Sequence, residues 1–386
     1  MYNFGLCMYN RLQTFARSGE NSLFLWGARQ TGKSTLISKF FPDALMLDLL
    51  KSEVYQSLLL RPNSLREIVR ASHSKTVVLD EIQKLPILLN EVHSLIESDK
   101  IRFILSGSSP RKIMRNNQNL LGGRALRYEL YPLSFAEIPD FNLNRAINYG
   151  LLPRHYLSDD PEVLISNYIN SYLEDEIYAE ARIRNLSVFA TFLHKAAFSN
   201  GDTVNYSNIA TDCGVSSPTV KEYFQILEDT MIGKYIHPFQ KRLKRQVIST
   251  PKFYFFDVGI VNHLLKRKNV VFGTELMGHA FEHLIYMELN AHSHYTQKNY
   301  PITFWKTKTK MEVDFILGDH EIAIEVKSTS QVQNKHLKNL KAFKEEYHVK
   351  YAIVVCNEVF PRLVDGGILI LPWKEFLSRL WKGEII

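Results

Sequence analysis

The chain has 386 residues, of which 45% are hydrophobic and 23% are charged. This length indicates two or three domains, and the apolar fraction is sufficient for their cores, which excludes a disordered chain. The sequence contains no apolar run long enough to cross a bilayer and no secretory signal at its start, so a cytoplasmic protein is expected.

The formal net charge of +7 is unevenly distributed. Lysine and arginine number 18 against 13 acidic residues in 1–140, 7 against 12 in 141–240, and 22 against 15 in 241–386. A basic end region is compatible with nucleic-acid binding and also with an ordinary soluble surface. The three cysteines (at positions 7, 213 and 356) are far apart, which predicts neither a disulfide framework nor a zinc site.

The first chemical motif lies at residues 27–35 and fits the phosphate-binding pattern G-x-x-x-x-G-K-[ST]. A buried strand is predicted before it at 23–26, and a helix after it at 34–40. The glycines let backbone N–H groups face phosphate oxygens, while Lys33 supplies a charge at the β- and γ-phosphates and Ser34 offers a hydroxyl to Mg²⁺. The predicted nucleotide-binding residues are Gly27, Ala28, Arg29, Gln30, Thr31, Gly32, Lys33, Ser34 and Thr35.

The run at 76–81 predicts the second half of the nucleotide site, because an apolar strand ends there in two acids. Asp80 is placed to hold Mg²⁺ and Glu81 to polarise the water that attacks the γ-phosphate, which predicts ATP hydrolysis. The alternative is a strand that ends in a solvated acidic turn. A strand at 44–47, helices at 64–72 and 87–97, and a strand at 102–105 complete an α/β alternation that predicts a doubly wound parallel sheet.

Polar residues that follow the predicted strand at 102–105 are further candidates. Ser106 is expected to lie between the two motifs, where it would sense the γ-phosphate or orient water. Arg124, on a glycine-rich turn, is a candidate to contact phosphate within its own subunit or in a neighbour, with Arg111 second. The alternative for Ser106 is a plain strand-to-loop turn, and the alternative for each arginine is a solvated side chain without a functional role.

Four segments in this order resemble a known protein family. They are Leu79-Asp80-Glu81-Ile82-Gln83-Lys84, Leu105-Ser106-Gly107-Ser108-Ser109, Gly123-Arg124 and Pro132-Leu133-Ser134-Phe135. The chain resembles prokaryotic AAA-type ATPases and is similar to the archaeal-type members of the AAA+/STAND group, whose C-terminal part was long catalogued as a domain of unknown function. The resemblance covers nearly the whole chain. It implies ATP hydrolysis and assembly into a homo-oligomer such as a hexameric ring.

The middle of the chain is predicted to be helical from 153 to 200 and then to form a winged helix. Residues 205–224 follow helix-turn-helix spacing, with Gly214 in the turn and Ser217 as the cap of the second helix, and 231–238 predicts a wing strand. A structural or protein-docking role is favoured over major-groove reading, because the region is net acidic. The candidate DNA contacts are Lys221, Lys241, Arg242, Lys244 and Arg245, and a solvated linker is the alternative for the last four.

In the last part, two predicted strands at 312–317 and 322–326 form a hairpin. Asp314 and Glu325 fall on neighbouring strands, and Lys327 shares a face with Glu325. This arrangement looks like a PD-(D/E)XK nuclease core, in which two carboxylates hold Mg²⁺ and the lysine steadies the attacking water. The alternatives are an exposed ion pair and a fold kept for DNA binding without cleavage. The predicted nuclease-like site consists of Glu282, Asp314, Glu325 and Lys327.

The sequence therefore predicts three domains. They are an AAA-type P-loop ATPase domain (1–140), a helical and winged-helix domain (141–245) and a PD-(D/E)XK nuclease-like α/β domain (246–386). The leading hypothesis is an ATP-hydrolysing protein that acts on DNA, with branched or Holliday-type DNA as one candidate substrate. The alternatives are a STAND-type nucleotide-controlled switch with a non-catalytic end domain, and a defence or toxin-type nuclease.

Overall fold

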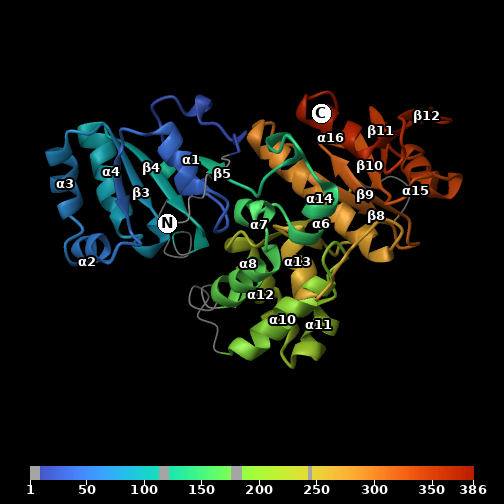
Figure 1. The fold of residues 1–386 in the computed structure, drawn as a ribbon, viewed down its shortest axis with the longest axis horizontal. Helices are drawn as coiled ribbons and strands as arrows, with labels where there is room; N and C mark the ends of the chain where they lie inside the picture. Colours follow the sequence, from blue (N-terminus) through green and yellow to red (C-terminus); the bar gives the residue numbers. More distant parts are fainter. Residues whose placement is uncertain (1–8, 112, 114–120, 175–184, 242–245) are drawn as a thin grey trace. The chain divides into compact units, whose positions relative to one another are not determined.

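The computed structural model describes residues 9–111, 113, 121–174, 185–241 and 246–386, which divide into two compact units (Figure 1). The nucleotide unit comprises Gln13–Pro132 and Gln225–Ile232. The C-terminal unit comprises Leu133–Phe224, Gly233–Ile386 and the described part of Met1–Leu12. Among the described helices, none combines the length and apolar character needed to cross a membrane.

The nucleotide unit is built on a parallel sheet of strand order β2-β3-β4-β1-β5. Its strands are β1 (Ser22–Trp26), β2 (Leu45–Asp48), β3 (Thr76–Asp80), β4 (Arg102–Gly107) and β5 (Ala125–Glu129). Its helices are α1 (Lys33–Phe40), α2 (Ser52–Leu60), α3 (Ser64–Ser72) and α4 (Leu88–Asp99). The predicted parallel sheet is thus confirmed, whereas α2 and β5 were not expected from the sequence.

The central strands of this sheet are buried on both faces. Every residue of β1 is buried, and Phe24 and Trp26 pack in one cluster with Leu79 of β3, Leu105 of β4 and Val92 of α4. Strands enclosed on both sides read as continuous apolar runs, which is why these segments were recognisable in the sequence. Polar residues at their carboxyl ends are therefore held on a rigid frame.

The C-terminal unit contains a mixed sheet of strand order β12-β13-β11-β10-β9-β8. Its strands are β8 (Ile302–Lys306), β9 (Glu312–Leu317), β10 (Ile322–Val326), β11 (Tyr351–Cys356), β12 (Arg362–Val364) and β13 (Ile368–Pro372). The β9–β10 pair is antiparallel, which confirms the expected hairpin, and β10 and β11 are parallel.

Helices cover both faces of this sheet. They are α14 (Glu275–Tyr295), α15 (Asn334–Lys344) and α16 (Trp373–Trp381). Phe315 packs in one cluster with Phe281 of α14 and Phe376 of α16, whereas its neighbour Ile316 packs in another with Phe343 of α15. Successive strand residues face opposite sides, so one hairpin serves two cores.

The remaining elements of the C-terminal unit are mostly helical. They are α6 (Leu143–Tyr149), α7 (Pro153–Leu157), α8 (Pro161–Tyr168), α10 (Leu186–Phe198), α11 (Tyr206–Cys213), α13 (Val258–Leu264), the antiparallel pair β6 (Gly233–Ile236) and β7 (Lys252–Phe255), and the first part of α12 (Ser217–Asp229). Gly214 ends α11 in the left-handed conformation, with φ of 65°. The expected cap of α12 is wrong by one residue, because Ser216 and not Ser217 accepts the backbone N–H of Thr219, at 3.3 Å.

Candidate functional site

The loop between β1 and α1 has the backbone geometry of a phosphate-binding loop. Gly32 immediately precedes α1 with φ of 95°, a conformation that glycine adopts without strain. At Gly27, an added Cβ would lie 2.4 Å from the carbonyl oxygen of Leu130, so only glycine fits between β1 and that segment. Both glycines of the motif are thus required by local geometry.

Lys33 lies folded over this loop. Its ammonium donates to the carbonyl oxygens of Gly27 at 2.8 Å and Ala28 at 3.3 Å, and its residue is only 6% exposed. These bonds hold the ammonium at the loop, close to the start of α1. A buried charge beside a helix N-terminus favours an anion there.

Asp80 joins two segments of the nucleotide unit. Its carboxylate accepts a hydrogen bond from Ser34 of α1 at 2.7 Å and another from Ser106 of β4 at 2.5 Å. This is possible because β4 lies between β1 and β3, which places the end of β4 between the phosphate-binding loop and Asp80. A hydroxyl and a carboxylate are the hard oxygen ligands that Mg²⁺ prefers, so Ser34 and Asp80 fit that ion.

Glu81 follows Asp80 in an unusual backbone conformation. Its φ of 59° and ψ of 43° fall in the left-handed region, which is uncommon outside glycine and concentrates at functional sites. Its carboxylate accepts a hydrogen bond from the side-chain amide of Gln83, which also donates to Ser108 Oγ at 3.0 Å. Both Glu81 and Gln83 are buried.

Gln83 is a site residue that the sequence analysis missed. It lies in the motif that supports the family resemblance, but no spacing rule identifies a side chain that bonds Glu81. Its amide oxygen is buried and lies 2.2 Å from where a Cβ on Gly107 would be, so Gly107 is needed for this close approach.

The two candidate arginines have partners in the nucleotide unit. Arg124 bonds the carboxylate of Glu97, and 43% of its side chain is exposed. Arg111 is 1% exposed and bonds the carboxylate of Asp229. The structure therefore leaves Arg124 at the surface and holds Arg111 inside.

A second group of charged residues lies on the β9–β10 hairpin. Lys327 Nζ is 2.7 Å from Glu325 Oε1 and 3.8 Å from Asp314 Oδ2. Asp314 also accepts the backbone N–H of Val326 at 2.7 Å. The structure thus brings together three of the four residues predicted for the nuclease-like site.

Burial sets the protonation of this group. It raises the pKa of Glu325 to about 8 and that of Asp314 to about 6. Repulsion by Asp314 adds to the pKa shift of Glu325, and repulsion by Glu282 adds to that of Asp314. Burial lowers the pKa of Lys327, but Asp314 and Glu325 outweigh it, so the net shift is upward. Glu325 Oε2 is buried without a hydrogen-bond partner among the described residues. This oxygen favours a cation or a proton beside it.

Glu282, the fourth predicted residue, is held by a buried lysine that the sequence did not single out. Lys252 Nζ lies 3.1 Å from Glu282 and 2.7 Å from Glu312, and Tyr254 donates its hydroxyl to Glu282. Glu282 also raises the pKa of Asp314, although less than burial does, so its charge acts on the hairpin group. In the described part of the chain, no three acidic, histidine or cysteine side chains are grouped closely enough to hold a metal ion.

The structure describes two of the five candidate DNA contacts. Lys221 is exposed, with its ammonium 5.2 Å from the centre of the Tyr206 ring. Lys241 pairs with Asp319 at the surface. Arg242, Lys244 and Arg245 lie outside the described residues.

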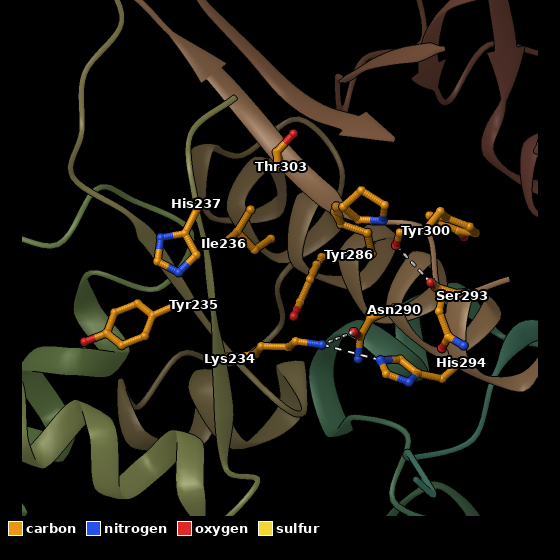
Figure 2. Close-up of a pocket in the computed structure, with 13 residues that line it drawn as sticks. Lys234, Tyr235, Ile236, His237, Tyr286, Asn290, Ser293, His294, Tyr300 and Thr303 are labelled. Atoms are coloured by element: carbon orange, nitrogen blue, oxygen red, sulfur yellow. Dashed lines mark hydrogen bonds between the residues drawn. The ribbon is translucent and has the colours of Figure 1, made fainter. Parts of the chain in front are cut away.

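A pocket of about 340 Å³ lies elsewhere in the C-terminal unit (Figure 2). Figure 2 shows Lys234 of β6 reaching towards α14, where its ammonium lies 3.3 Å from Asn290 Oδ1 and 3.4 Å from His294 Nε2. None of the site residues predicted from the sequence lines this pocket.

Comparison with known proteins identifies the part that holds the phosphate-binding loop. Residues 19–139 match the AAA domain family. The chain thus contains an AAA domain, which agrees with its parallel sheet. Residues 140–270 match a domain of unknown function (DUF8612), and residues 277–376 match another (DUF4143).

Relatives that are similar over most of the chain come from bacteria and archaea. An uncharacterized protein of Methanocaldococcus jannaschii is 24% identical over 92% of this chain and 84% of its own length. Uncharacterized proteins of Haemophilus influenzae and Mycobacterium tuberculosis are 22% and 23% identical, over 78% and 80% of this chain and 77% and 70% of their own lengths. The similarity to these relatives therefore extends well beyond the residues that match the AAA domain family.

Proposed function

We propose that the AAA domain hydrolyses ATP. The observation that carries this proposal is the Asp80 carboxylate, which accepts hydrogen bonds from Ser34 at the start of α1 and from Ser106 at the end of β4. Glu81 follows directly, so a phosphate-binding loop, a metal-binding acid and a second acid meet at the carboxyl ends of parallel strands. That edge is where open α/β sheets bind ligands.

Each residue has a defined role in this reaction. The backbone of residues 27–35 and Lys33 bind the phosphates. Ser34 and Asp80 would hold Mg²⁺, which neutralises charge on the phosphate oxygens. Glu81 orients the attacking water and accepts its proton. Ser106 would hydrogen-bond the γ-phosphate or this water, and Arg124 would contact phosphate within a homo-oligomer such as a hexameric ring.

Two variants separate ATP binding from turnover. Lys33→Ala should abolish binding of a fluorescent ATP analogue, whereas Glu81→Gln should keep binding and stop phosphate release. Lys39→Ala, which removes an exposed lysine from the same helix, serves as the control and should behave as wild type. Phosphate release that persists in Glu81→Gln would exclude Glu81 as the base.

We further propose that the C-terminal unit acts on DNA, branched DNA included. The support is the proximity of Lys327 to Glu325 and Asp314, together with the unpartnered buried oxygen of Glu325. Two carboxylates and a lysine are the groups that position a metal ion and an attacking water in phosphodiester hydrolysis. Asp314 and Glu325 would hold Mg²⁺, and Lys327 would steady the water.

Cleavage assays with linear, forked and four-way DNA test this role in the presence of Mg²⁺ or Mn²⁺. Cleavage that is lost in Asp314→Ala, and kept in the control Asp365→Ala at an exposed position, supports a nuclease. Cleavage that survives Asp314→Ala contradicts the assignment. If no cleavage is observed, faster ATP turnover in the presence of DNA supports DNA binding alone. ATP turnover that DNA does not change, together with oligomers that depend on the bound nucleotide, favours a nucleotide-controlled switch.

A further inference from the structure

A second, larger pocket in the C-terminal unit is rich in lysines. Its volume is about 920 Å³, and three segments far apart in the sequence form it. The first contributes residues 203–207 and the start of α12, the second residues 248–251, and the third the end of β8 with the turn that follows. Its lysines are Lys221, Lys306, Lys308 and Lys310, and its hydroxyl residues include Thr203, Ser207, Ser217, Ser249, Thr250 and Thr307.

The charge of this pocket is strongly positive. No aspartate or glutamate lines it within the described residues. Lys308 and Lys310 are exposed and form no ion pair with another described residue, whereas Lys306 pairs with Glu312 at 2.6 Å. Two full positive charges thus remain available on one turn, with the exposed Lys221 on another wall.

The turn that carries Lys308 and Lys310 is well ordered by its own hydrogen bonds. Thr307 accepts the backbone N–H of Met311 on its hydroxyl at 3.1 Å, and Lys308 donates its backbone N–H to Gln246 at 2.9 Å. A fixed turn presents its lysines at little further entropic cost, which favours binding of an extended anion over transient contacts.

The pocket connects to the nuclease-like group through a chain of ion pairs. Lys306 bonds Glu312, Glu312 bonds Lys252, and Lys252 bonds Glu282, whose charge raises the pKa of Asp314. Glu312 also lies two residues before Asp314 on β9, on the same face of the strand. A polyanion bound at Lys306 would therefore lie beside β9, the strand that carries Asp314.

We propose that this pocket binds the phosphate backbone of DNA and guides it to Asp314 and Glu325, an inference that rests on the DNA role proposed above. Lysines and hydroxyl donors without carboxylates are the groups that contact phosphates independently of sequence. Cations on two separate segments suit an anion with regularly repeated charges better than a single phosphate. Ser217 and Lys221, at the start of α12, would contact the backbone rather than read bases.

Fluorescence anisotropy with a labelled DNA duplex tests this site. The double variant Lys308→Gln/Lys310→Gln should bind DNA about tenfold more weakly than wild type. The slope of log Kd against the logarithm of the salt concentration, measured between about 50 and 200 mM NaCl, should be smaller by about two. Lys308→Arg/Lys310→Arg should bind as wild type, since the charge is retained. Lys374→Gln/Lys382→Gln removes two exposed lysines outside the pocket and should change neither quantity. Melting curves verify that each variant is folded.

The outcomes separate this inference from the proposed function. Wild-type DNA binding that Lys308→Gln/Lys310→Gln leaves unchanged overturns the pocket assignment while the DNA role stands. A wild-type protein that binds no DNA overturns both. An RNA of the same length that binds more tightly than the duplex, and loses affinity in the same variant, overturns DNA as the ligand.

Discussion

Gln83 donates its side-chain amide to the carboxylate of Glu81, and the same amide reaches Ser108 Oγ at 3.0 Å. The proposed catalytic base is thus held between the end of β3 and the loop after β4. The Glu81 carboxylate accepts this hydrogen bond and a longer one from Ser108 Oγ at 3.5 Å, so Gln83 is its nearer orienting donor. Gln83 is therefore a positioning residue for the proposed hydrolysis.

Gln83→Ala should lower kcat for ATP hydrolysis about tenfold, because the carboxylate of Glu81 loses its orienting donor. ATP affinity should stay unchanged, since the hydrogen bonds described for the Gln83 side chain go to Glu81 and Ser108 and not to the phosphate-binding loop. Phosphate release and binding of a fluorescent nucleotide measure the two quantities. Gln83→Glu, which places a second carboxylate beside Glu81, should reduce turnover further. Turnover equal to wild type in both variants would exclude this role.

Gly27→Ala should weaken ATP binding about tenfold or more, because the new methyl group would lie 2.4 Å from the Leu130 carbonyl and force the loop to shift. Gly278→Ala is the matched control, since its Cβ would meet only Ser328 Oγ at 3.7 Å, an ordinary contact. Titration with a fluorescent nucleotide compares the two. Equal affinities in both variants would contradict the steric requirement at Gly27.

Glu288 makes the stability of the C-terminal unit depend on pH. Burial raises the pKa of its carboxyl from the ordinary 4.5 to about 8, although bonds from Trp381 Nε1 and the Phe135 backbone N–H partly oppose this shift. The folded state then binds a proton that the unfolded state releases. This contribution to the free energy of unfolding is fully present below pH 4.5 and is lost as the pH rises to about 8.

Glu288→Gln removes this titration but also one acceptor, so it should be less stable than wild type in acid. The difference between the two proteins should narrow as the pH rises from about 5 to about 9. Melting temperatures across that range measure it. A constant difference at every pH would contradict a raised pKa for Glu288.

Lys252 neutralises two acids at once, with 3% of its side chain exposed against 18% for Glu282 and 23% for Glu312. Lys252→Met should lower the free energy of unfolding by about 2–4 kcal/mol, because Glu282 loses its lysine partner and Glu312 keeps only Lys306. Urea unfolding measures this effect, with Lys374→Met at an exposed position as the control. The double variant Lys252→Met/Glu282→Gln should recover part of the loss.

The residues proposed to bind the nucleotide were identifiable from local sequence. The phosphate-binding loop is one continuous segment whose glycines and lysine are required by its own backbone, and Asp80 ends an apolar strand that only a sheet buried on both faces explains. The β9–β10 hairpin was predictable for the same reason, since the spacing of Asp314, Glu325 and Lys327 follows from strand alternation.

Partners contributed by distant segments were not predictable from the sequence. Lys252 meets Glu282 and Glu312, and Arg111 meets Asp229, only because packing brings separate elements together. The choice between Arg124 at the surface and Arg111 inside also depends on burial, which spacing does not encode.

The sequence by itself determined the residues and the backbone conformation of the loop at Gly27, because the positions of its glycines fix that conformation locally. Only the tertiary structure decided which side chains surround Glu81 and which lysines share a pocket. Those contacts join residues separated by up to about a hundred positions, and their geometry follows from how whole strands and helices pack.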